Sequence, residues 1–293
     1  MQGGISMAAY SLGLYEKAMP SGLTWEEMLR DTAEGGFDTL EISIDESDYR
    51  LSRLDWDRNQ RIQLRHASEQ AGIPIRTMCL SGHRKYPFGS HDPAIRRRSR
   101  QIMEKAVDLA GDIGVRIIQL AGYDVYYETG DGDTRRWFAE NLQYAAEYAA
   151  RSGVLLGFET METPFMDTVD KAMYWVKKVD SPYLGVYPDI GNLKNASVVY
   201  ETDMLADLKA GWGSILAAHL KETKPGIYRN LDFGTGHTEY IPCIRMLWDM
   251  GVRHYTGEFW YQQGDDHRKK ILAASEFLRE RIEAAAKGEV PHA

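Results

Sequence analysis

Three carboxylates and one imidazole stand at or near the ends of short apolar runs in the second half of the chain. The residues are Glu159, Asp189, His219 and Glu258, and their runs are residues 154–159, 183–189, 215–219 and 254–258. A carboxylate at the end of a buried strand costs free energy to desolvate unless a partner stabilises its charge. Four such ends in succession, each preceded by a helix-length segment, predict that these side chains converge on one divalent metal ion.

The chemistry of this set defines which metals fit it. Two glutamates, one aspartate and one histidine offer mainly oxygen ligands and no thiolate, which suits Mn²⁺, Co²⁺, Zn²⁺ or Mg²⁺ and argues against a structural zinc cage. Any one of the four, taken alone, would be explained more simply as an ion pair or a helix-capping carboxylate. Four consecutive strand ends would need four separate explanations of that kind, so we predict one divalent metal ion as the cofactor.

Glu159 and Glu258 are the two ligands of equal kind, and they lie on strands that are not adjacent. A metal with vacant positions can hold two neighbouring oxygens of a ketose and lower the barrier to removing the proton next to the carbonyl, which gives an enediolate. Each glutamate can give one oxygen to the metal and use the other for proton transfer. Inverting a stereocentre needs two such groups on opposite faces, so we predict that Glu159 and Glu258 are the catalytic pair.

Eight apolar, strand-like segments alternate with helix-like segments along the chain. Several are almost continuously apolar, as is typical of parallel strands covered on both faces. The expected strands are residues 11–15, 39–44, 75–81, 116–121, 154–159, 184–188, 215–219 and 254–258.

The segments between the strands carry helix signals. Thr24-x-x-Glu27 is a capping-box pattern, and the pair Gly35-Gly36 supplies a stop. A glycine also stands just before four of the strands, where it can take the left-handed conformation that ends a helix. These glycines are Gly72, Gly114, Gly153 and Gly251.

Eight uninterrupted β-then-α units predict an α/β fold, a single (β/α)8 TIM barrel that takes up residues 1–293, with its core at about residues 11–285. An open doubly wound sheet is the alternative, but the first β-to-α turn lacks the Gly-x-Gly-x-x-Gly phosphate loop. Active sites of TIM barrels lie at the carboxyl ends of the strands. The four metal candidates would then close strands five to eight and lie side by side around half of the rim.

Residues near these strand ends suggest a small, charged polyol as substrate. Lysines beside glycine turns can bind a phosphate through their charge and neighbouring backbone N–H groups. Candidates for binding it are Lys17, His83 with the adjacent Arg84 and Lys85, Lys221 and Lys224. Aromatic residues just beyond strand ends can wall the pocket, and these are Tyr15, Phe88, Trp260 and Tyr261.

Composition excludes several classes of partner. The 293 residues carry a net charge of −8, which disfavours a nucleic-acid partner because phosphate backbones require a basic surface. The two cysteines, Cys79 and Cys243, form no disulfide framework and fit a reducing compartment. We find no signal-peptide pattern and no apolar run long enough for a membrane span. A cytoplasmic location without membrane association is therefore expected.

Five blocks of sequence closely resemble one enzyme family. They are residues 14–20, 50–56, 118–127, 187–192 and 219–226. These blocks resemble the bacterial L-ribulose-5-phosphate (L-xylulose-5-phosphate) 3-epimerases, which belong to the xylose-isomerase-like TIM-barrel superfamily and serve L-ascorbate and related sugar-acid catabolism. The likeness extends from about residue 12 to about residue 285.

The resemblance implies a divalent-metal enzyme that interconverts L-ribulose 5-phosphate and L-xylulose 5-phosphate by deprotonation and reprotonation at C3. The family's metal-binding glutamate, aspartate, histidine and glutamate fall on Glu159, Asp189, His219 and Glu258. Epimerases of unphosphorylated ketoses often have a histidine a few residues after the aspartate, where this chain has Asn192, so its contact to the sugar must differ. Glu162 stands where relatives carry another acid and is a further candidate for substrate binding. Such barrels often pair through apolar helix faces, which would give a homodimer.

Other functions remain open at this point. The same metal site would serve a hexulose-6-phosphate isomerase or epimerase, another aldose–ketose isomerase, or a lyase that removes water from a cyclic polyol. A metal-dependent DNA-repair endonuclease on this barrel would need many more histidines than the eight present. A non-catalytic sugar-phosphate sensor is the non-enzyme alternative, and it would be expected to lack one of the two proton-transfer glutamates.

Overall fold

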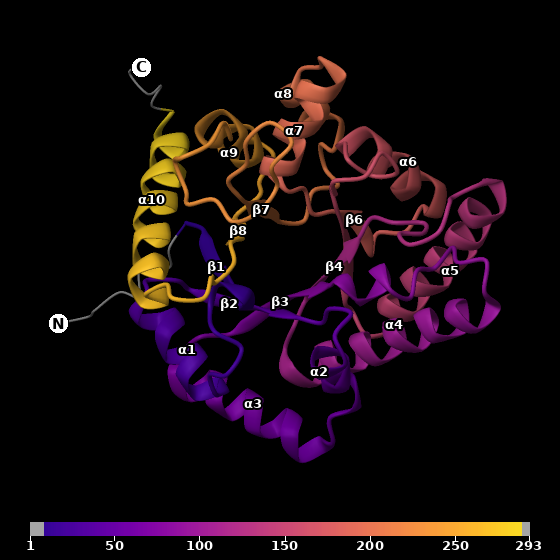
Figure 1. Ribbon diagram of the computed structural model, residues 1–293, viewed down its shortest axis with the longest axis horizontal. Coiled ribbons are helices and arrows are strands. Elements are labelled where there is room, and N and C mark those ends of the chain that lie inside the picture. Colours follow the sequence, from indigo (N-terminus) through magenta and orange to yellow (C-terminus); the bar gives the residue numbers. More distant parts are fainter. Residues whose placement is uncertain (1–8, 289–293) are drawn as a thin grey trace.

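Eight parallel β-strands arranged in a ring form the centre of the molecule (Figure 1). The structure is a computed structural model, and it describes residues 9–288. The strands are β1 (Ser11–Tyr15), β2 (Thr39–Ser43), β3 (Ile75–Leu80), β4 (Ile117–Ala121), β5 (Leu155–Glu159), β6 (Leu184–Val186), β7 (Ala218–Leu220) and β8 (His254–Gly257). Seven continuous pairings give the order β6-β5-β4-β3-β2-β1-β8-β7.

The ring closes between β6 and β7, where the pairing is reduced to isolated bridges. Val186 pairs with Ile215 and Asp189 with His219. The Val186 N–H donates to the Ser214 carbonyl at 2.9 Å, and the His219 N–H donates to the Pro188 carbonyl at 2.9 Å. With this closure the predicted (β/α)8 barrel is confirmed.

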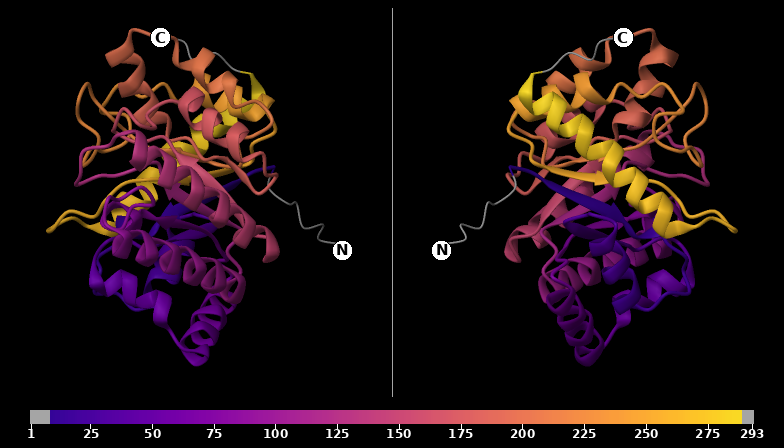
Figure 2. Two further views of the ribbon diagram at one scale, coloured as in Figure 1. Left: turned by 90° about the vertical axis from the view of Figure 1, so that its right-hand side faces the viewer. Right: turned by 90° about the vertical axis from the view of Figure 1, so that its left-hand side faces the viewer.

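Helices surround the strands on the outside of the ring (Figure 1). They are α1 (Trp25–Glu34), α2 (Asp48–Leu51), α3 (Arg58–Ala71), α4 (Pro93–Ile113), α5 (Gly132–Arg151), α6 (Val169–Val179), α7 (Ile190–Tyr200), α8 (Met204–Ala210), α9 (Tyr240–Asp249) and α10 (His267–Lys287). Short 3-10 helices occupy Glu16–Ala18, Ser52–Asp55 and Ser81–Arg84. Figure 2 shows α10, in yellow, running obliquely across the outer side of the strands. Among residues 9–288, no helix is long and apolar enough to cross a membrane.

The helix boundaries follow the local signals in the sequence. The Thr24 side chain accepts from the Glu27 N–H while the Glu27 carboxylate accepts from the Thr24 N–H, which completes the predicted capping box. The four glycines expected to end helices all adopt a positive φ, between 65° and 91°. Only glycine takes this conformation without strain, so the turns from helix to strand are fixed by residue type.

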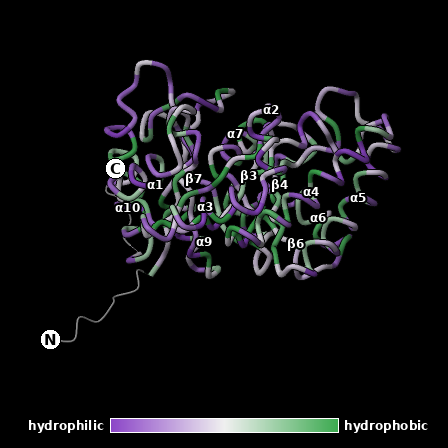
Figure 3. The backbone as a smooth tube through the Cα atoms, turned by 90° about the horizontal axis from the view of Figure 1, so that it is seen from below, coloured by the Kyte–Doolittle hydropathy of each residue, from purple (hydrophilic) through white to green (hydrophobic). Residues whose placement is uncertain are grey.

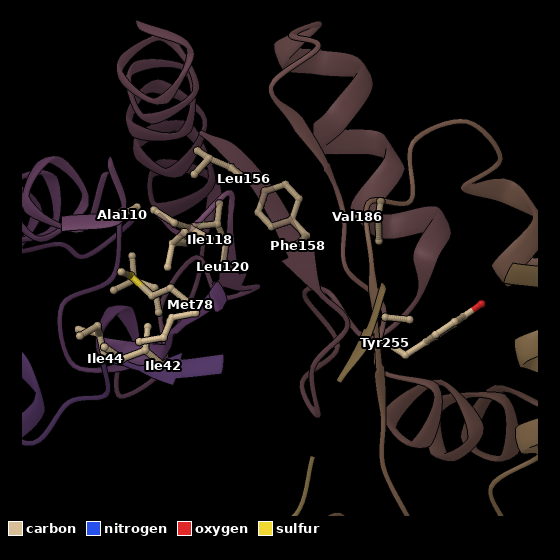
Figure 4. Packing of buried hydrophobic residues seen from close by; sticks show 14 of the residues in the cluster. Ile42, Ile44, Met78, Ala110, Ile118, Leu120, Leu156, Phe158, Val186 and Tyr255 are labelled. Atoms are coloured by element: carbon tan, nitrogen blue, oxygen red, sulfur yellow. The ribbon is translucent and has the colours of Figure 1, made fainter. Parts of the chain in front are cut away.

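The two faces of the barrel strands differ in chemistry. Leucine, isoleucine and phenylalanine side chains pack toward the helices, as Figure 4 shows for Ile42, Ile118 and Phe158. Figure 3 shows hydrophilic residues in the outer loops and also along outer helices such as α3. The inner face instead carries polar side chains that reach across the ring and small residues that leave room for them. Gly157 is one of them: a Cβ there would lie 3.0 Å from the Tyr187 side chain, so glycine leaves room for the buried tyrosine ring. The barrel interior is therefore a polar layer beneath the carboxyl ends of the strands.

The seventh strand differs from its predicted bounds. We expected residues 215–219, whereas β7 covers Ala218–Leu220 and Ile215 makes only an isolated bridge. The short β6 offers few partners on this side, so the apolar residues 215–217 do not form a continuous ladder. His219 consequently lies inside β7 and not at its end.

Candidate metal centre

The four predicted ligands come together at the carboxyl ends of neighbouring strands. Glu159 is the last residue of β5, Asp189 precedes α7, His219 lies in β7, and Glu258 directly follows β8. All four are buried, and one ligand atom of each lies within 4.8 Å of the others. His219 Nδ1 is 3.7 Å from Glu159 Oε1, 3.9 Å from Asp189 Oδ2 and 3.5 Å from Glu258 Oε2.

Asp189 both caps helix α7 and belongs to the cluster of candidate ligands. Its Oδ1 accepts the Asn192 N–H at 2.7 Å and caps the amino end of α7. Its own N–H donates to Thr160 Oγ1 at 3.0 Å, which fixes the backbone at the end of the strand. The second oxygen, Oδ2, is left to face the other three ligands. The helix-capping role and the metal-binding role are therefore compatible in this residue.

Unsatisfied oxygens in the cluster fit a bound cation. Asp189 Oδ2 and Glu258 Oε2 are buried and receive no hydrogen bond from the described residues. The Lys221 ammonium lies 3.2 Å and 3.1 Å from them, close enough for charge attraction but outside hydrogen-bond geometry. Buried carboxylate oxygens without partners are unfavourable, and coordination to a metal removes the penalty. The donor set, three carboxylates and one imidazole, suits the divalent ions that the sequence predicts.

Burial and mutual repulsion shift the pKa values of these carboxyl groups in opposite directions. Burial, and then the charge of Glu258, raise the pKa of Glu159. Burial, opposed by Lys221 but reinforced by Glu258, raises the pKa of Asp189 to about 7. Burial also acts against ionisation of Glu258, but the charges of Lys221 and His219 outweigh it and hold the pKa of Glu258 well below its usual range. In the metal-free protein, Asp189 therefore holds a proton below about pH 7, whereas the surroundings of Glu258 favour its ionised form.

Metal affinity is expected to rise with pH for this reason. The ion binds Asp189 only in its ionised form. Because the pKa of Asp189 is about 7, its carboxyl group must release a proton when the metal binds. Below that pH the proton competes, and the apparent affinity falls by up to about tenfold per pH unit for each proton released. Calorimetric titration with Mn²⁺ between pH 6 and 8, in buffers of different ionisation enthalpy, measures the metal affinity and the number of protons released on binding. A pH-independent affinity with no released proton would contradict this description of Asp189.

The cavity beside the cluster contains most of the predicted substrate contacts. Of the six candidates, Lys17, Glu162, Asn192 and Lys221 line it, together with the predicted aromatic walls Tyr15 and Trp260. These residues come from segments that follow β1, β5, β6, β7 and β8, as expected for the active end of a TIM barrel.

Besides Lys221, the other three candidates in the cavity also have partners in the protein. Lys17 forms an ion pair with Asp45 at 2.6 Å, and Glu162 accepts a hydrogen bond from the Tyr123 hydroxyl at 3.0 Å. Asn192 donates its amide to the Thr160 carbonyl at 2.7 Å, while its Oδ1 is buried without a partner among the described residues. An acceptor of this kind, in a residue that lines a polar cavity, is suited to a sugar hydroxyl.

Two predicted contacts, His83 and Lys224, do not line this cavity. His83 packs against Phe88 with 4.5 Å between ring centroids, and its Nε2 lies 3.2 Å from the Ser99 carbonyl oxygen. Burial lowers the pKa of His83 to about 4, so it is neutral at physiological pH. Lys224 belongs to a turn in which its N–H donates to the Ile227 carbonyl. The expected walls Phe88 and Tyr261 likewise lie outside the lining.

Two further residues lie at the site: Arg84, which the sequence offered only as a neighbour of His83, and Glu41, which it did not single out. Arg84, from the same loop as His83, lines the cavity, and its guanidinium lies over the Tyr123 and Tyr126 rings at 5.7 Å and 5.0 Å. Glu41 lies fully buried in β2 and contacts His219 from below. The signal for Glu41 was present, because a glutamate interrupts the apolar run of residues 39–44.

Comparison with known proteins identifies the family. A family model described as xylose isomerase-like TIM barrel matches residues 29–281. The L-ribulose-5-phosphate 3-epimerase UlaE of Shigella boydii serotype 18 is 42% identical over 275 residues, which cover 94% of this chain and 95% of that protein. The protein of the same name from Escherichia coli strain SE11 gives the same identity and coverage.

Solved structures support the fold. A D-psicose 3-epimerase from Clostridium cellulolyticum H10, solved with D-tagatose, superposes with a TM-score of 0.77 at 18% identity and covers 93% of this chain and 99% of that one. An L-ribulose 3-epimerase superposes with a TM-score of 0.75 at 18% identity, covering 95% and 96%. At this level of identity the structures establish the architecture alone. The sequence relatives are named epimerases, which are isomerases, and the predicted enzyme class is thereby confirmed. By the match of its sequence and its barrel, the chain belongs to the xylose isomerase-like TIM-barrel family.

Proposed function

We propose that the protein is a divalent-metal-dependent 3-epimerase that interconverts L-ribulose 5-phosphate and L-xylulose 5-phosphate. The observation that carries this proposal is the pair Glu159 and Glu258 within one buried cluster of metal ligands. The two glutamates belong to β5 and the end of β8, which are separated in the ring by other strands. The name of the 42% identical relatives, L-ribulose-5-phosphate 3-epimerase, supports the choice of substrate.

The two glutamates account for inversion at C3. A divalent ion held by Glu159, Asp189, His219 and Glu258 would stabilise the negative charge that develops on the substrate oxygens next to C3. One glutamate removes the C3 proton from one face, and the other delivers a proton to the opposite face. Whichever glutamate acts as the base toward one epimer acts as the acid when the other epimer is the substrate, so the pair serves both directions of the reaction.

Lys221 and Asn192 complete the part of the site that holds the sugar. The Lys221 side chain is buried, and burial is outweighed by the surrounding carboxylates, which raise its pKa, so it carries a positive charge. An ammonium in this position can stabilise an oxygen that becomes negative during proton transfer. The unpaired Asn192 Oδ1 can accept a hydrogen bond from a hydroxyl group.

Arg84 is the residue best placed to bind the phosphate. The other cations that line the cavity each have a carboxylate partner: Lys17 has Asp45, Lys221 has Asp189 and Glu258, and Arg229 has Glu162. Arg84 forms no ion pair with any described residue, and its Nε is buried without a hydrogen-bond partner. A guanidinium that is held by aromatic rings and lacks an acidic partner fits a phosphate oxygen.

The variant Arg84→Met is expected to lower kcat/KM for L-ribulose 5-phosphate by about 10- to 100-fold, since charge-assisted hydrogen bonds contribute about 1.5–3 kcal/mol. The kcat/KM for unphosphorylated L-ribulose should stay unchanged. Lys85→Met is the matched control, because it removes the same charge from the neighbouring residue, which is exposed and does not line the cavity. Equal losses for both substrates in Arg84→Met, or a loss in Lys85→Met, would argue against this phosphate site.

The remaining features of the proposal follow from the family resemblance. We place the enzyme in the cytoplasm, in L-ascorbate or related sugar-acid catabolism, and take Mn²⁺ as the first ion to test. Both cysteines are buried and unpaired, which agrees with a reducing compartment. The substrate is a small sugar phosphate, and the protein requires neither nucleic acid nor membrane; a homodimer is the proposed assembly.

Product formation by the metal-stripped and metal-loaded enzyme tests the function. The chelator-treated protein is divided and reloaded with Mn²⁺, Co²⁺, Zn²⁺ or Mg²⁺, and ¹³C NMR follows L-ribulose 5-phosphate. We expect L-xylulose 5-phosphate only in metal-loaded samples. Conversion of a hexulose 6-phosphate in its place would transfer the protein to the hexulose-phosphate enzymes. Binding of sugar phosphate without turnover, with every ion, would indicate a sensor.

A further inference from the structure

Glu41 is a fully buried carboxylate in the middle of β2, on the inner face of the barrel. Its Oε1 lies 2.7 Å from Nε2 of His219, which belongs to β7 on another part of the ring. Its Oε2 accepts a hydrogen bond from the Tyr187 hydroxyl at 3.1 Å, and the same hydroxyl lies 2.9 Å from Thr256 Oγ1. The Glu41 carboxylate thus joins β2, β7 and the segment after β6, and the Tyr187 hydroxyl extends this network to β8.

The two nitrogens of His219 face different surroundings. Nδ1 points toward the carboxylates of Glu159, Asp189 and Glu258, at 3.5–3.9 Å. The Gln119 amide nitrogen lies 3.0 Å from Nδ1 and 3.2 Å from Nε2, and as a donor at the shorter distance it fits an Nδ1 that carries no proton. Nε2 points away from them toward Glu41. A neutral imidazole binds a metal through the nitrogen that carries no proton and donates a hydrogen bond from the other. This arrangement assigns Nδ1 to the metal and the proton to Nε2.

We propose that Glu41 is a positioning residue of the metal centre. Glu41 accepts the Nε2–H of His219 and so holds the ring in the tautomer that presents the Nδ1 lone pair to the cation. The negative charge of Glu41 also makes Nδ1 a stronger electron-pair donor to the metal. The Tyr187 hydroxyl, which also bonds to Thr256, in turn holds the Glu41 carboxylate in place. Burying a carboxylate in a barrel interior is unfavourable, and it is offset here by the imidazole and the tyrosine hydroxyl. The inference rests on the proposed metal site and deepens it.

A purely structural role is the competing explanation, in which Glu41 only pairs with a buried histidine. The two explanations differ in what Glu41→Gln changes. A glutamine keeps the shape of the side chain and retains an oxygen that can accept the Nε2–H, but it removes the negative charge. Glu41→Leu removes the acceptor as well, while Tyr187 and Thr256 can still bond to each other.

The test measures metal binding and ring protonation directly, without turnover. Mn²⁺ affinity is determined by competition with a chelator for the full-length protein and for Glu41→Gln, Glu41→Leu and Glu16→Gln. Glu16 is the matched control, because it is also a buried glutamate but pairs with Arg53 and contacts none of the four ligands. We expect affinity to fall about 10- to 100-fold in Glu41→Gln, further in Glu41→Leu, and not at all in Glu16→Gln.

The tautomer provides the second readout. In long-range ¹H–¹⁵N spectra of the Zn²⁺-loaded, histidine-labelled protein, the protonated nitrogen of His219 should be Nε2, with a proton signal that moves in Glu41→Gln. Unchanged affinity in both Glu41 variants, or a proton on Nδ1, would overturn the positioning role. If the unmodified protein binds no metal, the proposed metal site itself fails. A variant that loses both thermal stability and affinity in proportion would point to the structural explanation.

Discussion

Replacing Glu258 with glutamine is expected to lower kcat for epimerisation by at least about 10³-fold. The change removes a proton-transfer group, which typically contributes 10²–10⁴-fold, and also a charged metal ligand. Glu159→Gln should have an effect of similar size, because the two residues act on opposite faces of C3. The variants should nevertheless differ in the half-reaction that they retain. Each should exchange the C3 proton of one epimer with D₂O without inversion, and the two should retain exchange for different epimers.

Metal loss alone would also reduce kcat, so Asp189→Asn serves as a control. Asp189 is a ligand with no assigned proton transfer, and its variant should lose metal affinity and exchange of both epimers together. Bound metal is quantified in every sample before the assay. If Glu159→Gln and Glu258→Gln, loaded with metal, retain exchange for the same epimer, or if either keeps substantial epimerisation, the two-glutamate mechanism is wrong.

Arg53→Met is expected to reduce the free energy of unfolding by about 3 kcal/mol, which is large compared with a typical point mutation. Arg53 and Glu16 are almost completely buried and form a two-pronged ion pair with both distances at 2.7 Å. Removing the arginine leaves the Glu16 charge buried with weaker partners, the Ser43 N–H and Arg50 at 3.2 Å. Because Glu16 lies between Tyr15 and Lys17, which line the cavity, KM for the substrate should also rise. Urea unfolding monitored by circular dichroism measures the change in stability.

Two comparison variants show whether the stability lost in Arg53→Met is due to the Glu16 charge that is left without its partner. In Arg53→Met combined with Glu16→Met, both charges are absent, and much of the stability should return. Arg30→Met removes an arginine whose side chain is half exposed and 3.5 Å from Asp31, and should change stability by less than about 0.5 kcal/mol. A double variant that is no more stable than Arg53→Met would contradict the argument.

The fold was predictable because its signals are local and repeated. Apolar runs alternate with helix-length segments, and glycines end several of the helices. Both signals arise from interactions between residues that are close in the sequence, so each part of the chain can be interpreted separately. The convergence of the four candidate ligands was predictable for a related reason: carboxylates at strand ends are unfavourable unless they share a partner, and the barrel brings successive strand ends together. The bounds of the seventh strand were wrong because pairing between β6 and β7 depends on a partner strand of only three residues.

Contacts within the cavity were harder to predict because they depend on side-chain direction within a loop. His83 and Arg84 are adjacent, yet the first packs into the core against Phe88 and the second lines the cavity. Both residues belong to the short 3-10 helix Ser81–Arg84, in which neighbouring side chains point in different directions. Glu41 was missed for a different reason, because its partner His219 lies 178 residues away and on another strand. Only the closed ring brings the two side chains together.

The central claim is tested most directly by the position at which solvent deuterium enters the substrate. L-Ribulose 5-phosphate is incubated in D₂O with the Mn²⁺-loaded enzyme and, separately, with the chelator-stripped enzyme, and NMR follows each carbon. The account predicts deuterium at C3, accompanied by L-xylulose 5-phosphate, only when metal is present. Deuterium at C1 would instead make the protein an aldose–ketose isomerase, and no exchange in the loaded sample would contradict the assigned substrate.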